Sequence, residues 1–286
     1  MQTKPAKPSF LRALLLLGRV SNLPTVWSNC LAGWLIVGGG AWPAFLQLCA
    51  GASLLYVGGM FLNDACDERF DRAHRPERPI PSGAVSGRLV WILSGAWLAG
   101  GTALLLTMRP EMALPGLGLL AAIVVYDVVH KRTALSPLIM AVCRFLLYLV
   151  AGATASGLIS PPLLWSAGAL AAYVTGLSFV ARTEATGTLA GRWPLALLLA
   201  PIAVAAMLHG EESLTIAVVF LLWLMLSLQP LIQRRASAVG KVVSRLLAGI
   251  VIVDMLAVPG ATAGQLTIFV LLLGSALRLQ KTIPAS

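Results

Sequence analysis

The stretch from residue 63 to residue 83 holds five of the eleven acidic residues of the 286-residue chain, directly after a long apolar run. If a helix continues through it, Asp64, Asp67 and Asp71 lie within a sector of roughly 60°, because successive helical residues are about 100° apart. Carboxylates crowded on one face repel one another unless a cation lies between them. Their hard oxygen ligands suit Mg²⁺ that is shared with substrate phosphates. The spacing therefore predicts a metal site at the end of an apolar helix.

Basic residues follow the carboxylates at three-residue intervals: Arg69, Arg72, Arg75 and Arg78. The guanidinium group is planar and always protonated, so it suits phosphate oxygens that a metal leaves uncovered. The prolines and the glycine that close the stretch end the helix and stiffen the loop. An alternative is a charged loop whose arginines only fix the membrane topology. That alternative explains the arginines but not carboxylates spaced three and four residues apart, so the metal and phosphate hypothesis is favoured.

The same stretch carries a longer pattern, Asn63-Asp64-x-x-Asp67-x-x-x-Asp71-Arg72 followed by Arg75-Pro76-x-Arg78-Pro79-x-Pro81-Ser82-Gly83. Over these twenty-one positions it resembles the first aspartate-rich motif of the UbiA superfamily of intramembrane prenyltransferases. The resemblance implies an all-α, polytopic membrane helical bundle of about nine to ten transmembrane helices. It also implies three catalytic residues that hold Mg²⁺: Asp64, Asp67 and Asp71. Four further residues of the motif are implied to bind substrate: Asn63, Arg72, Arg75 and Arg78.

The composition excludes an ordinary water-soluble domain. Hydrophobic residues make up 58% of the chain and charged residues 11%, a balance typical of an integral membrane protein. The formal net charge is +10, but basic residues of a polytopic protein mainly record topology and contact with anionic lipid head groups. Nucleic-acid binding is therefore not supported. The four cysteines have no paired spacing and no histidine cluster nearby, so they are interpreted as small buried side chains.

Apolar runs of spanning or nearly spanning length recur ten times, each closed by glycine, proline or charge. They cover residues 23–39, 43–63, 87–107, 111–129, 135–157, 162–182, 193–208, 213–229, 241–258 and 264–280. UbiA-type proteins usually have nine membrane helices, so the division of residues 241–280 is where this count departs from the family. No soluble domain interrupts the runs. Residues 1–286 are therefore predicted to form one membrane domain, with residues 1–22 as a cytoplasmic interfacial segment rather than a cleaved signal.

The basic residues predict the orientation. With the N-terminus in the cytoplasm, nineteen of the twenty-one lysines and arginines fall on the cytoplasmic side, where such residues are enriched. Only Arg109 lies on the opposite side, and Arg144 falls within a span. The chain is thus predicted to be a multi-pass protein of the inner membrane whose active site faces the cytoplasm.

A second cytoplasmic end is expected to complete the site. The segment Tyr126-Asp127-Val128-Val129-His130-Lys131-Arg132 resembles the tyrosine and lysine-arginine segment that the family has at this place. By that resemblance Lys131 and Arg132 bind diphosphate and Tyr126 lines the substrate cavity. Two roles for Asp127 stay open, namely support of the metal and orientation of a base. The alternative is a topogenic Lys-Arg pair with an incidental aspartate.

The second acidic motif of the family is reduced in this chain. Where the family has its second aspartate-rich motif, the sequence reads Ser178-Phe179-Val180-Ala181-Arg182-Thr183-Glu184-Ala185-Thr186-Gly187, with Glu184 as the one carboxylate. Glu184 is expected to contribute to metal binding and catalysis, and Arg182 to bind substrate and replace some of the missing metal charge. This divergence also resembles UbiA-like proteins found in ebo-type gene clusters.

Two further positions have open interpretations. Arg19 and Asn22 resemble the opening of the family at the cytoplasmic mouth, where Asn22 is expected to bind substrate, although a helix cap explains Asn22 equally well. Arg144 lies about nine residues into its span, some 14 Å deep at about 1.5 Å per residue. An intramembrane charge faces protein or a wet cavity, so Arg144 either reaches the substrate chamber or pairs with Asp254.

Three functions are weighed. The first is a Mg²⁺-dependent membrane prenyltransferase that moves a prenyl group from a polyprenyl diphosphate to an unidentified lipophilic or aromatic acceptor. The second is a non-catalytic membrane protein that binds or transports isoprenoids or other lipids and retains the diphosphate site. A CDP-alcohol phosphotransferase also uses membrane aspartates, but the proline-arginine run does not fit the motif of that family.

Overall fold

The computed structural model describes residues 8–186, 193–232 and 239–284, apart from the side chains of residues 183–186 and 232. The described residues are helical or lie in turns, without a β-strand. The α-helices are α1 (Phe10–Leu17), α2 (Leu23–Ile36), α3 (Trp42–Cys66), α4 (Glu68–His74), α5 (Gly87–Leu106), α6 (Ala113–Val129), α7 (Ser136–Ser156), α8 (Pro161–Thr186), α9 (Trp193–Leu197), α10 (Ala200–His209), α11 (Leu214–Ile232), α12 (Val239–Leu256) and α13 (Ala263–Leu279). Short 3-10 helices precede α2, α6 and α11.

Every predicted apolar run coincides with a helix, or in one case with two. The run at 193–208 is divided into α9 and α10, because Pro201 occupies the first turn of α10 and has no N–H to continue a helix from α9. Within the described residues, six helical stretches are long and apolar enough to cross a bilayer. Helix α2 is shorter than these, and α12 carries three charged residues. The all-α membrane bundle is confirmed, whereas the exact number of spans stays a prediction.

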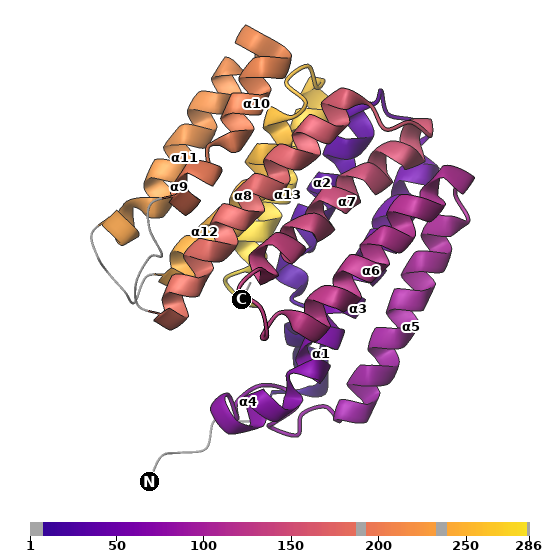
Figure 1. Cartoon of the computed structure of the whole chain (residues 1–286), viewed down its shortest axis with the longest axis vertical. Helices are drawn as coiled ribbons and strands as arrows, with labels where there is room; N and C mark the ends of the chain where they lie inside the picture. Colours follow the sequence, from indigo (N-terminus) through magenta and orange to yellow (C-terminus); the bar gives the residue numbers. More distant parts are fainter. Residues whose placement is uncertain (1–7, 187–192, 233–238, 285–286) are drawn as a thin grey trace.

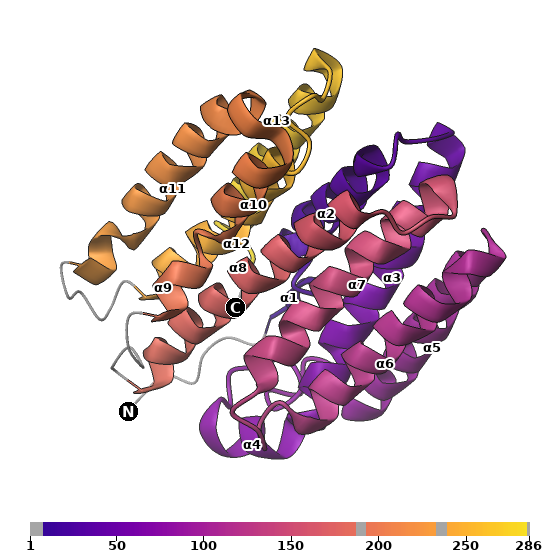
Figure 2. The same ribbon diagram turned by 45° about the horizontal axis from the view of Figure 1, so that its top comes forward.

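The long helices lie roughly side by side in one bundle (Figures 1 and 2). Helices α3, α5 and α6 form one edge, α10 and α11 form the opposite edge, and α2, α7, α8 and α12 lie between them. Most residues of α2 and α12 are buried, whereas α11 exposes large apolar side chains such as Val218, Leu222 and Met225. This distribution suits a bundle whose outer helices face lipid.

The pair Gly58 and Gly59 lets α3 approach two neighbours closely. A Cβ atom on Gly58 would lie 2.9 Å from Leu98 of α5, and one on Gly59 would lie 2.8 Å from Ile123 of α6. Neither position has room for a larger side chain. This close packing fixes α3 between the two helices that flank it.

A small apolar cluster holds the loop after α4 in place. Ile80 and Val85 of this loop are buried against Leu17 of α1 and Phe61 of α3. This part of the loop is therefore folded back against α1 and α3, at the bottom of the bundle in Figure 1.

Candidate active site

The three aspartates of the motif lie at the junction of α3 and α4. Asp67 joins the two helices in helical backbone geometry, and its carbonyl accepts the N–H of Asp71 at 2.9 Å. The near-continuous helix puts the three side chains on one buried face, where Asp64 and Asp67 are each 7% exposed and Asp71 is 2% exposed. The convergence predicted from helical spacing is therefore present.

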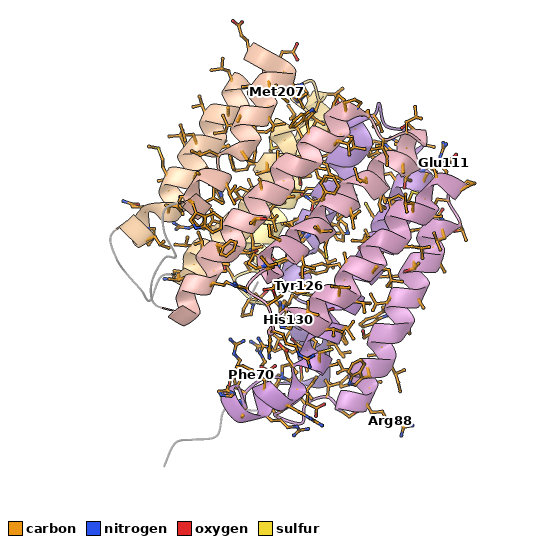
Figure 3. All side chains as sticks on the ribbon, in the orientation of Figure 1. Phe70, Arg88, Glu111, Tyr126, His130 and Met207 are labelled. Atoms are coloured by element: carbon orange, nitrogen blue, oxygen red, sulfur yellow. The ribbon has the colours of Figure 1, made fainter. Side chains whose placement is uncertain are left out.

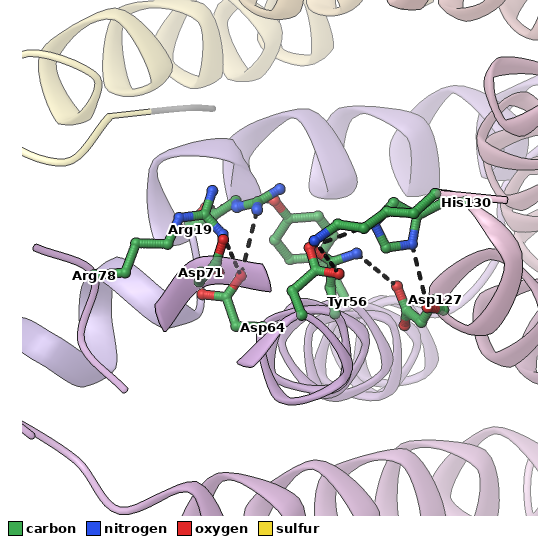
Figure 4. A network of polar contacts seen from close by, with 10 residues as sticks. Arg19, Tyr56, Asp64, Asp71, Arg78, Asp127 and His130 are labelled. Carbon is green, nitrogen blue, oxygen red and sulfur yellow. Dashed lines mark hydrogen bonds and ion pairs between the residues drawn. The ribbon is translucent and has the colours of Figure 1, made fainter. Parts of the chain in front are cut away.

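Two arginines neutralise Asp64 and Asp71. Arg78 donates from Nη1 to Asp71 at 2.9 Å and to Asp64 at 3.3 Å, and Arg19 lies 3.6 Å from Asp64 (Figure 4). Arg78 reaches them because the buried Ile80 and Val85 fold its loop back against α1 and α3. One guanidinium thus bridges two carboxylates of the motif.

Arg19 enters this cluster through an unusual backbone. Its φ is 41° and its ψ 46°, in the left-handed region, and among the described residues it is the one non-glycine residue with positive φ. Its carbonyl accepts the hydroxyl of Tyr56 at 3.4 Å. Such conformations cost of order 1–3 kcal/mol and gather at functional sites, so this turn between α1 and α2 marks Arg19 as part of the site.

Asp67 has different partners. Lys131 Nζ lies 2.7 Å from its Oδ1 and His130 Nε2 lies 3.4 Å from its Oδ2, both residues following the end of α6. Burial alone would raise the pKa of Asp67, but the hydrogen bonds from His130 and Lys131 outweigh burial and hold that pKa below its usual value. The same hydrogen bond raises the pKa of His130. Lys131 also lies over the ring of Phe70, 3.8 Å from its centroid.

A cavity of about 250 Å³ opens among these groups. We call it the polar cavity. Its charged and amide lining includes Asn63, Asp67, Asp71, Arg75, Arg78 and Lys131. Tyr126 and His130, which line it as well, lie above Phe70 in Figure 3. The cavity combines carboxylate oxygens with several cationic donors, a set suited to a phosphate group and an accompanying divalent cation.

An apolar cavity of about 390 Å³ adjoins it and is formed by α2, α3, α6, α7, α8 and α12. Most of its wall is aliphatic, with Val26, Leu55, Ile123, Leu147, Leu177 and Ile250. Arg19 and Tyr126 line both cavities, so they mark the junction. Tyr126 lies on a cavity wall, where the resemblance had placed it, and Asn22 lines the apolar cavity.

The carboxylates of the motif supply some, but not all, of the ligands that a divalent cation needs. Asp71 Oδ1 is buried and accepts no hydrogen bond from any described residue, so it keeps a free ligand position. However, no group of three His, Cys, Asp or Glu side chains in the described part of the chain is gathered closely enough to hold a metal. Each motif carboxylate pairs with a cation of the protein instead. Oxygen ligands from a bound diphosphate would complete a coordination sphere that Asp67 and Asp71 begin.

The structure does not bring every predicted residue to the polar cavity. Arg72 pairs with Glu68 one helical turn earlier at 2.6 Å and its side chain is 57% exposed, so the structure does not bring it to the site. Arg132 is exposed beyond the end of α6 and lines neither cavity. Arg182 lines the apolar cavity, where it donates to Ser136 Oγ at 2.7 Å and to the carbonyl of Ala134 at 2.8 Å. The side chain of Glu184 lies outside the described residues.

Arg144 reaches the apolar cavity, as one of its two interpretations had it. The other interpretation, direct pairing with Asp254, needs a correction. Arg144 Nη1 donates to Asn29 Oδ1 at 2.6 Å, and Asn29 Nδ2 donates to Asp254 at 2.8 Å. The amide therefore occupies the position that a direct ion pair would need.

Sequence reasoning gave His130 no role, although the structure places it on Asp67. A signal was present, since His130 directly precedes Lys131 and follows Asp127 by three residues on the same helical end. The apolar wall residues Met140 and Cys143 carried no comparable signal, because an apolar run reveals its length but not its cavity-facing side.

Comparison with known proteins agrees with this geometry. The model of the UbiA prenyltransferase family matches residues 22–233. The digeranylgeranylglyceryl phosphate synthase of Methanoculleus marisnigri is 32% identical over 123 residues, which cover 42% of this chain and 43% of the relative. The synthase of the same name from Ignicoccus hospitalis is 37% identical over 100 residues, 35% of this chain and 33% of the relative. The chain thus matches less than half the length of these relatives.

Two solved structures share the fold. A structure described as giving insight into the biosynthesis of digeranylgeranylglyceryl phosphate synthase in membranes has a TM-score of 0.64 at 19% identity, covering 87% of this chain and 97% of that one. A UbiA homologue from Archaeoglobus fulgidus, bound to DMAPP and Mg²⁺, has a TM-score of 0.53 at 14% identity, covering 96% and 100%. At these identities the likeness supports the fold alone.

Proposed function

The chain belongs to the UbiA prenyltransferase family, and we propose from this that it transfers a prenyl group from a polyprenyl diphosphate to an acceptor within the membrane. The observation that supports the proposal is the junction of the polar and apolar cavities at Arg19 and Tyr126. A polyprenyl diphosphate has the same division, with a highly charged head and an apolar tail. The polar cavity suits the head, and the apolar cavity suits the tail together with a lipophilic or aromatic acceptor.

We assign the diphosphate to the cations of the polar cavity. Arg75, Arg78 and Lys131 offer charged donors, and Asn63 offers an amide. Arg72 and Arg132, which the sequence pattern also suggested, are left out because they line neither cavity. Asn22 and Arg182 are assigned to the apolar cavity, on the acceptor side of the junction.

Mg²⁺ is the cofactor that we propose, held by Asp67 and Asp71 with Asp64 beside them and with Glu184 as the remaining acid of the second motif. When bound, it neutralises charge that develops on the leaving diphosphate. Occupancy requires the ion pairs of Asp67 and Asp71 to loosen as the diphosphate takes up Arg78 and Lys131. The UbiA homologue bound to DMAPP and Mg²⁺ supports the choice of metal.

The apolar cavity excludes water from the reacting carbon of the donor. Breaking the allylic carbon–oxygen bond leaves an electrophile that water would capture, and aliphatic walls keep water away from it. The acceptor class stays open. The relatives are named for digeranylgeranylglyceryl phosphate, so a glycerophosphate lipid with one geranylgeranyl chain is the first acceptor to test.

We further propose that residues 1–286 act as one membrane domain with the polar cavity on the cytoplasmic side of the inner membrane. The excess of lysine and arginine on that side supports the orientation. Helix α1 is amphipathic in sequence and exposes Phe10 and Leu11, which suits a segment lying along the membrane interface.

The test uses the full chain in lipid nanodiscs with Mg²⁺ and radiolabelled geranylgeranyl diphosphate. A panel of hydroxyl-bearing acceptors includes the glycerophosphate lipid, 4-hydroxybenzoate and farnesol. We expect acceptor-dependent release of diphosphate, and loss of Mg²⁺-dependent donor binding in Asp67→Asn and Asp71→Asn. Glu68→Gln is the matched control, because Glu68 pairs with the exposed Arg72 outside both cavities. Donor binding that is unchanged in Asp67→Asn would overturn the assignment.

A second candidate is a lipid-binding or lipid-transporting protein that holds an isoprenoid diphosphate without turning it over. Its specific support is the reduced second acidic motif, with Glu184 as its one carboxylate. Tight Mg²⁺-dependent donor binding together with no turnover across the panel would favour this candidate. Absence of both would contradict the two functions alike.

A further inference from the structure

One carboxylate of the site is not committed to a cation. Asp127 of α6 is 2% exposed, and its Oδ1 accepts a hydrogen bond from Asn63 Nδ2 at 3.2 Å. No described residue donates to its Oδ2, although that atom is buried. A buried polar atom without a partner is rare and costly, so it calls for a functional explanation.

The position of Asp127 separates it from the metal-binding acids. Asp127 lines the apolar cavity and not the polar one, whereas its hydrogen-bond partner Asn63 lines the polar cavity. Figure 4 shows Asp127 near His130 and apart from the cluster of Asp64, Asp71 and Arg78. Its chain neighbour Tyr126 lines both cavities. Asp127 is therefore on the apolar, acceptor side of the junction, one residue from Tyr126, which lines both cavities.

No other described acid competes for this place. Asp127 is the one carboxylate among the described residues that line the apolar cavity. Asp254 is absent from that lining, and both of its oxygens accept hydrogen bonds from Ser28, Asn29 and Tyr148. Asp64 and Asp71 are already paired with Arg19 and Arg78, and neither lines the apolar cavity.

We propose that Asp127 is the catalytic base, and that its Oδ2 accepts the proton of a hydroxyl group on the acceptor. The inference rests on the proposed prenyl transfer. In the step, the allylic carbon–oxygen bond of the donor breaks with its electron pair leaving on the diphosphate. The acceptor oxygen forms the new bond to that carbon as its O–H proton passes to Asp127. Asp127 returns the proton to water or to the departing diphosphate, which restores the carboxylate.

The proposal also limits the acceptor class. A carboxylate in an apolar wall repels an anionic group and binds a neutral group that donates a hydrogen bond. The reacting group is therefore a neutral hydroxyl of an alcohol or phenol, and any phosphate or carboxylate of the acceptor lies away from Asp127. Arg144 and Arg182 line the same cavity, and their guanidinium groups could bind such an anionic group of the acceptor.

The first experiment needs no acceptor. Dicyclohexylcarbodiimide is an apolar reagent that modifies carboxyl groups able to take up a proton in apolar surroundings. We treat the full chain in nanodiscs and map the adducts by peptide mass spectrometry. The expected result is modification at Asp127 that is lost in Asp127→Asn, with Asp64 and Asp254 unmodified. An unmodified Asp127 would overturn the proposal, whatever the outcome of the transferase assay.

The second experiment measures the reaction. Asp127→Asn is nearly isosteric and keeps the hydrogen bond with Asn63 possible, so folding should survive. We expect kcat to fall by roughly 10²- to 10⁴-fold, Mg²⁺-dependent donor affinity to stay within about threefold, and Asp127→Glu to recover part of the rate. Glu68→Gln is the control. Normal turnover in Asp127→Asn, or loss of donor binding as for a metal ligand, would contradict the proposal. Wild-type protein without turnover would instead contradict the proposed function, and the adduct mapping would still test whether Asp127 takes up a proton.

Discussion

Arg144 of α7 and Asp254 of α12 are joined through the side-chain amide of Asn29 and not directly. The oxygen of Asn29 accepts from Arg144 at 2.6 Å, while its nitrogen donates to Asp254 at 2.8 and 3.0 Å. Among the described residues neither charge has an ion-pair partner within 4 Å. A side-chain amide can connect a cation and an anion in this way because its oxygen accepts hydrogen bonds and its nitrogen donates them. The bundle thus connects a partly buried guanidinium and a buried carboxyl group across three helices.

This relationship predicts energetic coupling between residues that do not touch. We expect Arg144→Met and Asp254→Leu each to lower the free energy of unfolding by roughly 1.5–3 kcal/mol, because each removes a hydrogen bond between a charged group and Asn29. The double variant should be less destabilised than the sum of the two. Unfolding of all four proteins in the same detergent measures the coupling.

A matched cycle controls for general damage to α12. Arg245 lies on the same helix as Asp254 but donates to the carbonyl of Leu226 at 3.2 Å, away from Asn29. Arg245→Met combined with Asp254→Leu should be additive. If both cycles are additive, Asn29 transmits no coupling between Arg144 and Asp254.

The local part of the site could be predicted from spacing, whereas its partners could not. Helical periodicity placed Asp64, Asp67 and Asp71 on one face, and all three are buried there. Periodicity could not reveal that Lys131 and His130 form ion pairs with Asp67, while Arg78 forms one with Asp71. Those pairs depend on how the end of α6 and the loop after α4 fold back onto α3, which is a long-range property.

The arginines illustrate the same limit. Four of them at three-residue intervals looked equivalent in the sequence, yet Arg78 is held in the polar cavity and Arg72 points away from it. The Glu68–Arg72 pair at i and i+4 was a local signal that Arg72 already had a partner. The position of Arg78 was not readable, because it depends on the burial of Ile80 and Val85 against α1 and α3.

Arg78 and Arg72 should therefore differ in function. We expect Arg78→Gln to weaken Mg²⁺-dependent donor binding by roughly 10- to 100-fold, the scale of one lost hydrogen bond to a charged group. Arg72→Gln should change the affinity by less than about twofold, because an exposed ion pair contributes little. Calorimetric titration with geranylgeranyl diphosphate measures both, and Arg78→Lys should fall between them. Equal losses in the two glutamine variants would contradict the cavity assignment.

His130 predicts a pH-dependent stability of the metal-free protein. Because the hydrogen bond with Asp67 raises the pKa of His130, its stabilising contribution is fully present below the ordinary value of about 6.5. The contribution is lost as the pH rises through the raised pKa. The melting temperature of His130→Asn should thus fall further below that of the wild type at pH 6 than at pH 9. Measurement in the presence of EDTA keeps divalent cations from competing for Asp67.

The exposed His74 supplies the control for this comparison. His74 stacks on Phe70 and its ring nitrogen contacts a backbone carbonyl, without a carboxylate partner among the described residues. The melting temperature of His74→Asn should therefore differ from wild type by the same amount at both pH values. An equal deficit of His130→Asn at pH 6 and pH 9 would show that its pairing with Asp67 carries no charge.

Glu184 tests whether the reduced second motif still acts in catalysis. If Glu184 is the remaining acid of a working metal site, Glu184→Gln should leave donor binding near normal and lower turnover by roughly ten- to a thousandfold. That range is the scale of one lost electrostatic stabiliser of a transition state. If Glu184 only caps or orients its segment, turnover should barely change. Donor affinity and turnover are measured in the same nanodiscs, so that a folding defect would lower both together.

Asp71→Asn is the comparison that makes the Glu184 result decisive. Asp71 lies in the polar cavity and holds Arg78, so its loss should lower donor affinity first. Glu184, by contrast, should act only when charge develops on the leaving diphosphate, so its loss should appear in kcat with the donor affinity kept. Opposite effects of the two variants on affinity and kcat would indicate that the two acids divide the work of binding and ionisation. A loss of affinity in both would instead indicate that Glu184 and Asp71 contribute to one and the same metal site.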